Sequence, residues 1–233
     1  MFFPSFALLL LIVGCNSGNP AIMTQDVPAF THVETVGTSV QGRPIEIVLL
    51  GEGEKTVFLM STIHGNEQAG TRLLEEMIWH LRGSSILLEH VTVIIMPVAN
   101  PDGLAANTRY NANKIDLNRD FITSNSKTHK QGESTTPQPE CLAIERVIRK
   151  YNPDIVVTLH QPLNCIDYDG PGEMLASQMA ALCDLPVKKL GARPGSLGSF
   201  VGLMMDKPII TVELARTADT LPADMLWKRY GEM

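Results

Sequence analysis

The sequence predicts an α/β protein with the architecture of a three-layer α/β/α sandwich. From about residue 33 onward, short runs rich in β-forming residues alternate with helical patterns, and the central runs are almost continuously apolar. Strands that are covered by helices on both faces have this composition, because neither face meets water. An alternation of such strands with helices packs as a sheet between two helical layers.

Six strands are expected, and the most apolar of them should lie in the middle of the sheet. The expected strands are Glu34–Val40, Ile45–Leu50, Thr56–Thr62, Val91–Val98, Asp154–His160 and Pro208–Leu214. The third and fourth of these, and Ile155–Leu159 within the fifth, are almost continuously apolar through their middle, which indicates strands buried on both sides.

Four helices are expected between and after these strands. They are Glu67–Arg82, Glu140–Lys150, Gly172–Asp184 and Pro222–Tyr230. The first has the clearest pattern, because its large apolar residues recur on one helical face and Gly83 then ends it. The apolar residues of that face are Leu73, Leu74, Met77, Ile78 and Leu81.

The N-terminal segment predicts export. Met1–Gly14 is apolar, has no charged side chain and is shorter than the roughly 20 residues of a membrane-spanning helix, so it is interpreted as a secretory signal. Ile12-Val13-Gly14-Cys15 resembles the bacterial lipobox, whose cysteine is lipidated and becomes the mature N-terminus. An ordinary cleaved signal or a wrongly assigned start codon is the alternative. Residues 1–15 are thus the expected signal, 16–32 a tether and 33–233 the folded domain. The protein should then be periplasmic or at the cell surface, anchored through Cys15.

Composition excludes some classes of protein. The chain has 44% hydrophobic and 19% charged residues, which is typical of a globular protein, and its net charge of -6 argues against a nucleic-acid-binding function.

Besides Cys15, the chain has Cys141, Cys165 and Cys183. A Cys165–Cys183 disulfide would suit an exported protein, and buried free thiols are the alternative.

Two histidines and a glutamate follow two of the buried strands. His64 and Glu67 come at the end of the apolar run Val57–Ile63, and His160 ends the run Ile155–Leu159. Two imidazoles and one carboxylate are the usual ligands of a catalytic zinc ion, which keeps a fourth position open to water. Ligands bind beyond the carboxyl ends of strands in such sheets, so we expect one zinc ion per chain here.

The local sequence supports this interpretation. Glu67 is expected to open a helix, where the helix dipole favours an anion. Gly65 is expected to let the backbone pass close to the metal. The segment His160–Gly172 is expected to be a loop, because Pro162 cannot continue a strand.

A second group of polar residues follows the strand Val91–Val98. Asn100-Pro101-Asp102-Gly103 is good turn chemistry, and a long loop with Arg109 and Asp116-Leu117-Asn118-Arg119 comes after it. Arginine is suited to bind a carboxylate or an oxyanion. Solvated arginines on a surface loop are the alternative.

Glu213 stands near the end of the apolar strand Ile209–Leu214. A carboxylate in that position is costly unless it is paired or functional. We therefore consider it a candidate general base whose pKa is raised by partial burial. The alternative is a water-exposed glutamate on an edge strand.

Together these motifs resemble one family. His64-x-x-Glu67, Asn100-Pro-Asp-Gly, Asp116-Leu-Asn-Arg, His160 and Glu213 occur in the order seen in the zinc carboxypeptidase superfamily, over about residues 40–230. The segments Pro162–Asp167 and Pro194–Gly198 are similar to those of its murein tripeptide amidases, which cleave γ-D-glutamyl–meso-diaminopimelate bonds. The resemblance implies a mixed, largely parallel twisted sheet.

The resemblance also implies a role for each candidate residue. His64, Glu67 and His160 would bind zinc, Glu213 would activate water, and Arg109 would hold the carbonyl oxygen as it becomes an oxyanion. Asn118 and Arg119 would grip a free carboxylate of the substrate. The expected activity is hydrolysis of short peptidoglycan stem peptides at the γ-D-Glu–meso-diaminopimelate bond. Digestive carboxypeptidases place a tyrosine over the substrate, and Gly191–Asp206 contains none.

Two other functions stay open at this point. A zinc deacylase of the aspartoacylase or succinylglutamate desuccinylase type shares the His-Gly-Asn-Glu motif, and Arg109-Tyr110 with Asp116–Arg119 fits its arginine loop as well. The other alternative is a non-catalytic lipoprotein that binds cell-wall peptides. The presence of Glu213 argues against it, because a binding protein has no need of a general base.

Overall fold

The computed structural model describes residues 31–126 and 136–233. The expected signal, Cys15 and most of the expected tether lie outside the described residues. The first strand begins at Thr31, so the last two residues of the segment expected to be a tether belong to the sheet. None of the described helices has the length and apolar character that crossing a membrane requires.

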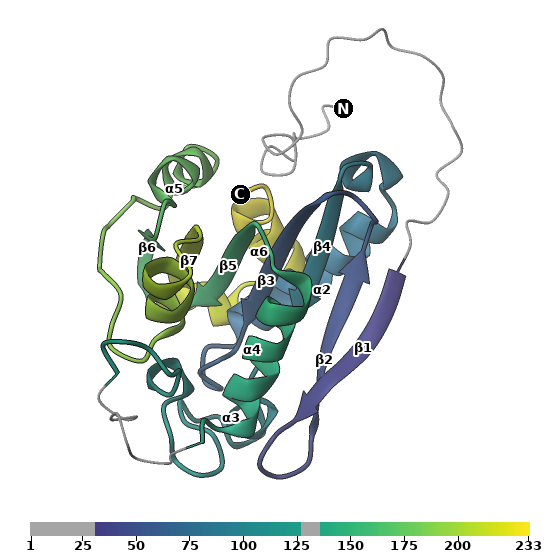
Figure 1. The fold of residues 1–233 in the computed structure, drawn as a ribbon. Coiled ribbons are helices and arrows are strands. Elements are labelled where there is room, and N and C mark those ends of the chain that lie inside the picture. The colour runs from purple at the N-terminus through teal and green to yellow at the C-terminus, as the bar shows by residue number, and fades with distance from the viewer. Residues whose placement is uncertain (1–30, 127–135) are drawn as a thin grey trace, which may run out of the picture.

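A seven-stranded sheet forms the middle layer of the molecule (Figure 1). Its strands are β1 (Thr31–Thr38), β2 (Pro44–Leu50), β3 (Lys55–Ser61), β4 (Val91–Met96), β5 (Ile155–His160), β6 (Leu163–Asp169) and β7 (Ile209–Ala215), in the spatial order β1-β2-β4-β3-β5-β7-β6. The strands β4, β3, β5 and β7 are parallel, while β1, β2 and β6 pair antiparallel at the two sides. The expected mixed, largely parallel sheet is confirmed.

Helices cover both faces of this sheet. α2 (Ala69–Arg82), α5 (Glu173–Ala180) and α6 (Ala223–Tyr230) pack on one face, and α4 (Pro139–Tyr151) lies on the other (Figure 1). Alternate residues of β3 enter the two cores: Val57 and Leu59 face α2, whereas Phe58 and Met60 face α4. The three-layer α/β/α prediction is therefore confirmed.

Three segments differ from the expectation, and the first is the helix α3 (Pro101–Ala106), which begins where a turn was expected. The loop expected over 160–172 contains β6, which pairs antiparallel with β7, for example Ile166 with Val212. Pro162 does end β5, but the chain reverses at the cis Gln161–Pro162 peptide and its next residues pair with the free edge of β7. Ser199–Met204 forms a π-helical turn that had not been anticipated.

The disulfide alternative is wrong. Cys141, Cys165 and Cys183 are all free thiols in the described part of the chain. Cys141 packs inside the core on the α4 side of the sheet, and Cys165 is fully buried within β6. These side chains behave as small hydrophobic residues, which is a common role of unpaired cysteine.

Candidate metal centre and active-site cavity

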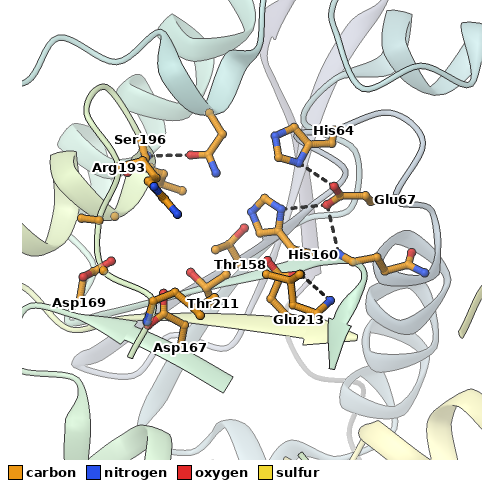
Figure 2. Close-up of a pocket in the computed structure, with 18 of the residues that line it drawn as sticks. His64, Glu67, Thr158, His160, Asp167, Asp169, Arg193, Ser196, Thr211 and Glu213 are labelled. Carbon is orange, nitrogen blue, oxygen red and sulfur yellow. Dashed lines mark hydrogen bonds and ion pairs between the residues drawn. The ribbon is translucent and has the colours of Figure 1, made fainter. Parts of the chain in front are cut away.

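His64, Glu67 and His160 converge at the carboxyl ends of β3 and β5 (Figure 2). Each offers one ligand atom, these atoms lie within 4.8 Å of one another, and all three residues are buried. The Nδ1 atom of His64 lies 2.9 Å from Oε1 of Glu67, and the Nδ1 atom of His160 lies 2.9 Å from Oε2 of the same carboxylate. Two imidazole nitrogens and a carboxylate fit a catalytic zinc ion, so the donor set matches the expected cofactor.

A strained turn brings His64 to this position. Thr62, the residue after β3, has a φ of 54°, a left-handed value that is rare for a β-branched residue. Its hydroxyl lies 2.6 Å from that of Thr71 on α2, and its carbonyl accepts a hydrogen bond from the Asn100 backbone N–H. Such strain persists only where surrounding contacts hold it, and it is often found beside functional groups.

Gly65 lies against the backbone of the next helix. A Cβ atom on Gly65 would lie 1.9 Å from the backbone carbon of Gly103, so glycine is required here for the close approach of α3 (Pro101–Ala106). The Asn100 side chain caps α3 by accepting from the Gly103 N–H at 2.9 Å, and it donates to the carbonyl of Ile63 at 3.2 Å. The Asn-Pro-Asp-Gly motif, which was expected to form a turn, is therefore the N-cap and first turn of α3, and it also braces the His64 turn.

Glu67 precedes α2 and does not open it. The helix begins at Ala69 with Gln68 as its N-cap, which leaves Glu67 outside the first turn. Burial disfavours the charged form of Glu67, but hydrogen bonds with His160 and His64 outweigh burial and lower its pKa to about 2. The backbone N–H of Gln161 donates to the same carboxylate at 3.1 Å. Glu67 is thus an anion at neutral pH, as a metal ligand must be.

Asp116 contacts His64 on the side opposite Glu67, an arrangement that its sequence motif did not predict. Its Oδ1 lies 3.1 Å from His64 Nε2, the ring nitrogen that points away from Glu67. Its other oxygen accepts from Arg109 Nε at 3.0 Å and lies 2.9 Å from an outer guanidinium nitrogen. Burial opposes ionisation of Asp116, but His64 and Arg109 keep its pKa well below the usual range. A carboxylate behind a histidine ligand orients its ring toward the metal.

The three candidate substrate-contacting residues line the same cavity as the metal group. Arg109, Asn118 and Arg119 all belong to its wall. An Arg109 guanidinium nitrogen lies 3.5 Å from Glu67 Oε1, so this cation stands directly beside the metal group. The Asn118 side-chain oxygen accepts from the backbone N–H of Leu197 at 2.9 Å. This bond ties the loop that carries Arg109 and Arg119 to the cavity segment around Leu197.

Glu213 lies beside His160 on the neighbouring strand, in register with it. It is 9% exposed and its Oε2 accepts a hydrogen bond from the Leu163 N–H at 3.2 Å. Burial raises the pKa of Glu213, against the opposing effects of His160 and of that hydrogen bond. The alternative of an exposed edge-strand glutamate is wrong, because β6 covers that edge of β7.

The cavity that holds these groups has a volume of about 330 Å³. Its wall also contains residues that had not been anticipated: Thr158, Asp167, Asp169, Arg193 and Thr211. They come from β5, β6, β7 and the segment after residue 190, and Figure 2 shows them around one hollow. No local pattern links the strand residues with Arg193, since only the folded chain brings the three strands and the segment after residue 190 to one place.

Comparison with known proteins gives a consistent result. The zinc carboxypeptidase family model matches residues 21–169. Murein peptide amidase A from Vibrio campbellii is 30% identical over 198 residues, which cover 76% of this chain and 77% of that protein. Carboxypeptidase M from Mus musculus is 30% identical over 145 residues, 52% of this chain, and the match spans only 32% of that protein.

Solved structures share the fold. The murein-tripeptide amidase from Escherichia coli O157 superposes with a TM-score of 0.65 at 24% identity, over 86% of this chain and 88% of that one. Carboxypeptidase A from Helicoverpa armigera gives a TM-score of 0.68 at 22% identity, over 79% of this chain and 59% of that one. The fold of this chain is thus shared with both enzymes.

Proposed function

Because the chain belongs to the zinc carboxypeptidase family, we propose that it is a zinc-dependent peptidase that hydrolyses short peptidoglycan stem peptides. The observation that carries this proposal is the buried group of His64, Glu67 and His160, with Glu213 in the same cavity. The substrate class is supported by the murein peptide amidases among the relatives, because the match to this chain covers most of the length of those proteins.

His64, Glu67 and His160 would hold the zinc ion, and Glu213 would act as general base. Zinc in such a site acts as a Lewis acid and makes water a nucleophile at neutral pH. Glu213 would take the proton of that water and later deliver it to the leaving nitrogen. Its burial supports this role, because a raised pKa brings its proton affinity closer to that needed near neutral pH.

Arg109 is proposed to stabilise the charge that develops on the carbonyl oxygen. Its guanidinium stands beside Glu67 and is held there by Asp116, so no reorganisation is needed when the charge appears. Asn118 and Arg119 are proposed to bind a free carboxylate of the substrate from the same wall. A planar guanidinium and an amide suit that ligand.

The proposed scissile bond is the one between γ-D-Glu and meso-diaminopimelate. The test is incubation of zinc-replete protein with L-Ala-γ-D-Glu-meso-diaminopimelate and, in parallel, with N-acylamino acids, followed by mass spectrometry of the products. Release of diaminopimelate supports the proposal, and release of acyl groups alone would identify a deacylase. Tight binding of the tripeptide without cleavage would indicate a binding protein.

Glu213→Gln separates catalysis from metal binding in the same assay. The variant should keep its zinc and lose activity by several orders of magnitude, because the amide cannot accept the proton. Glu173→Gln, a substitution on α5, is the matched control and should keep both. Turnover by Glu213→Gln near the wild-type rate would remove Glu213 from the role of base.

We also propose that the protein is exported and anchored by a lipid on Cys15. This proposal is supported by the apolar stretch Met1–Gly14 and the lipobox-like residues before the cysteine. Metabolic labelling with a lipid precursor should mark the wild-type protein but not the Cys15→Ser variant. Equal labelling of both would refute the anchor.

A further inference from the structure

The turn His160–Leu163, which joins β5 to β6, contacts both sides of the reacting centre. The backbone N–H of Gln161 donates to Glu67 Oε2 at 3.1 Å. The backbone N–H of Leu163 donates to Glu213 Oε2 at 3.2 Å. Hydrogen bonds to a charged carboxylate are stronger than those between neutral groups. One short turn therefore holds the carboxylate of a candidate metal ligand and that of the proposed general base.

The Gln161 side chain fastens this turn to two other elements. Gln161 is 6% exposed, and its Oε1 accepts from the backbone N–H of Ala69 at 3.1 Å. Its Nε2 donates to the carbonyl of Ala215 at 3.3 Å. Ala69 is the first residue of α2, and Ala215 is the last residue of β7. A single buried amide thus joins the turn to the start of a helix and to the end of a strand.

These two elements follow directly on the two carboxylates. Glu67 lies two residues before Ala69, and Glu213 lies two residues before Ala215. Figure 2 shows both carboxylates beside His160. Within residues 31–126, the N-cap residue of α2 gives that helix no side-chain hydrogen bond, so the amide of the turn supplies a partner for the helix start. The amide therefore links the helix that follows the metal ligand to the strand that carries the base.

A positioning role accounts for this arrangement better than contact with a substrate. Gln161 lines the cavity, but its amide oxygen and its amide nitrogen both have backbone partners, which fix its orientation. Reacting groups need accurate placement, and a displacement of about 1 Å can cost about 100-fold in rate. An amide that fixes the turn thus controls where the carboxylate of Glu213 stands.

We propose that Gln161 is a positioning residue that fixes the general base Glu213 relative to the metal group. This inference rests on the proposed peptidase function and adds a residue that acts through the base. The amide holds the turn against α2 and β7, and the turn holds the two carboxylates through its N–H groups. Without the amide, the Leu163 N–H would be free to shift, and Glu213 would shift with it.

Gln161→Met tests this in the full-length, zinc-replete protein, because methionine has a similar length and lacks both hydrogen-bonding groups. With L-Ala-γ-D-Glu-meso-diaminopimelate as substrate, kcat should fall about 10- to 100-fold, the cost of a misplaced reacting group. KM should change less than about threefold, because Asn118 and Arg119 are untouched. Gln68→Met is the matched control and should keep the wild-type kcat, since the Gln68 amide donates to Asn107, away from the cavity wall.

A double mutant separates positioning from a purely structural role. Glu213→Gln already lacks the base, so adding Gln161→Met should lower its residual rate less than about threefold. A further fall as large as that in the single variant would show that the two residues act independently and would overturn the inference. Gln161→Asn keeps an amide but is too short to reach both partners, and it serves if Gln161→Met fails to fold.

Two measurements do not depend on turnover. Gln161→Met should keep its zinc in atomic absorption, because all three candidate ligands remain. In calorimetry it should bind a phosphinic analogue of the tripeptide, in which a tetrahedral phosphinate replaces the scissile amide, about tenfold more weakly than wild type. Gln68→Met should bind the analogue as wild type does.

The outcomes separate the two proposals. Analogue binding that weakens in Gln161→Met, without cleavage of the tripeptide by wild type, refutes the proposed peptidase function but supports the positioning role. A kcat and an analogue affinity of Gln161→Met within about twofold of wild type would overturn the inference. A rise in KM at unchanged kcat, or loss of zinc from the variant, would overturn it as well.

Discussion

Replacing Asp116 by asparagine should weaken zinc binding while the fold persists. The Asp116 carboxylate lies 3.1 Å from His64 Nε2 and holds the ring with its Nδ1 toward Glu67. Asparagine has nearly the same shape but no charge. Its neutral amide would stand beside the Arg109 guanidinium in place of the carboxylate. The ring of His64 would therefore lose both its orientation and the basicity that the carboxylate confers.

The expected magnitude follows from the interaction that is lost. A hydrogen bond to a charged group contributes roughly 1.5–3 kcal/mol, and 1.4 kcal/mol corresponds to about tenfold in an equilibrium constant. The zinc dissociation constant should therefore rise about 10- to 100-fold, in agreement with the effect of losing a carboxylate behind a metal ligand. Activity at saturating zinc should also fall, because Arg109 is held by the same carboxylate.

Competition with a chromophoric chelator measures this change, and urea denaturation of the metal-free protein reports on the fold. The exposed Asp219→Asn substitution is the matched control and should leave the dissociation constant unchanged. A zinc affinity of Asp116→Asn within about twofold of wild type, with normal stability, would show that Asp116 does not orient His64.

Three further perturbations test other parts of the structure. His160→Ala should lose the metal, because two protein ligands remain, and a full zinc content by atomic absorption would remove His160 from the ligand set. Asp102 is buried, yet hydrogen bonds from Gln41, Ser39 and Arg43 lower its pKa from 3.8. A lowered pKa stabilises the fold above the unfolded-state pKa, and this contribution is lost as the pH falls through the folded-state pKa. Asp102→Asn should therefore reduce the free energy of unfolding in urea at neutral pH, with a deficit that shrinks on acidification. A deficit that is independent of pH would contradict this assignment. Phe58→Ala, at a position with no exposure, should cost about 3–5 kcal/mol in the same assay, and a loss below about 1 kcal/mol would contradict its place in the core.

Much of the fold was predictable from local sequence because its strongest signals are local. The run Val57–Ile63 is apolar since both faces of β3 are buried, and the spacing from Leu73 to Leu81 reflects one buried face of α2. His64 and His160 follow buried strands that are parallel, so both were expected at one edge of the sheet.

β6 could not be found in this way. Its residues alternate between a buried polar face, with Asp167 and Asp169, and a face that carries Ile166, and no apolar run marks it as a strand. It becomes a strand because β7 offers a free edge, and that edge exists only once the sheet has formed.

Amino-acid sequence alone predicted the candidate metal ligands, the candidate general base and the layers of this protein, because donor chemistry and hydrophobic periodicity depend on side-chain identity. Tertiary structure alone decided which groups meet. Asp116 reaches His64 across 52 residues, and the register of β5, β7 and β6 aligns Thr158 with Asp167. The physical reason is that hydrogen bonds and ion pairs act over a few ångströms in space, whatever the separation along the chain.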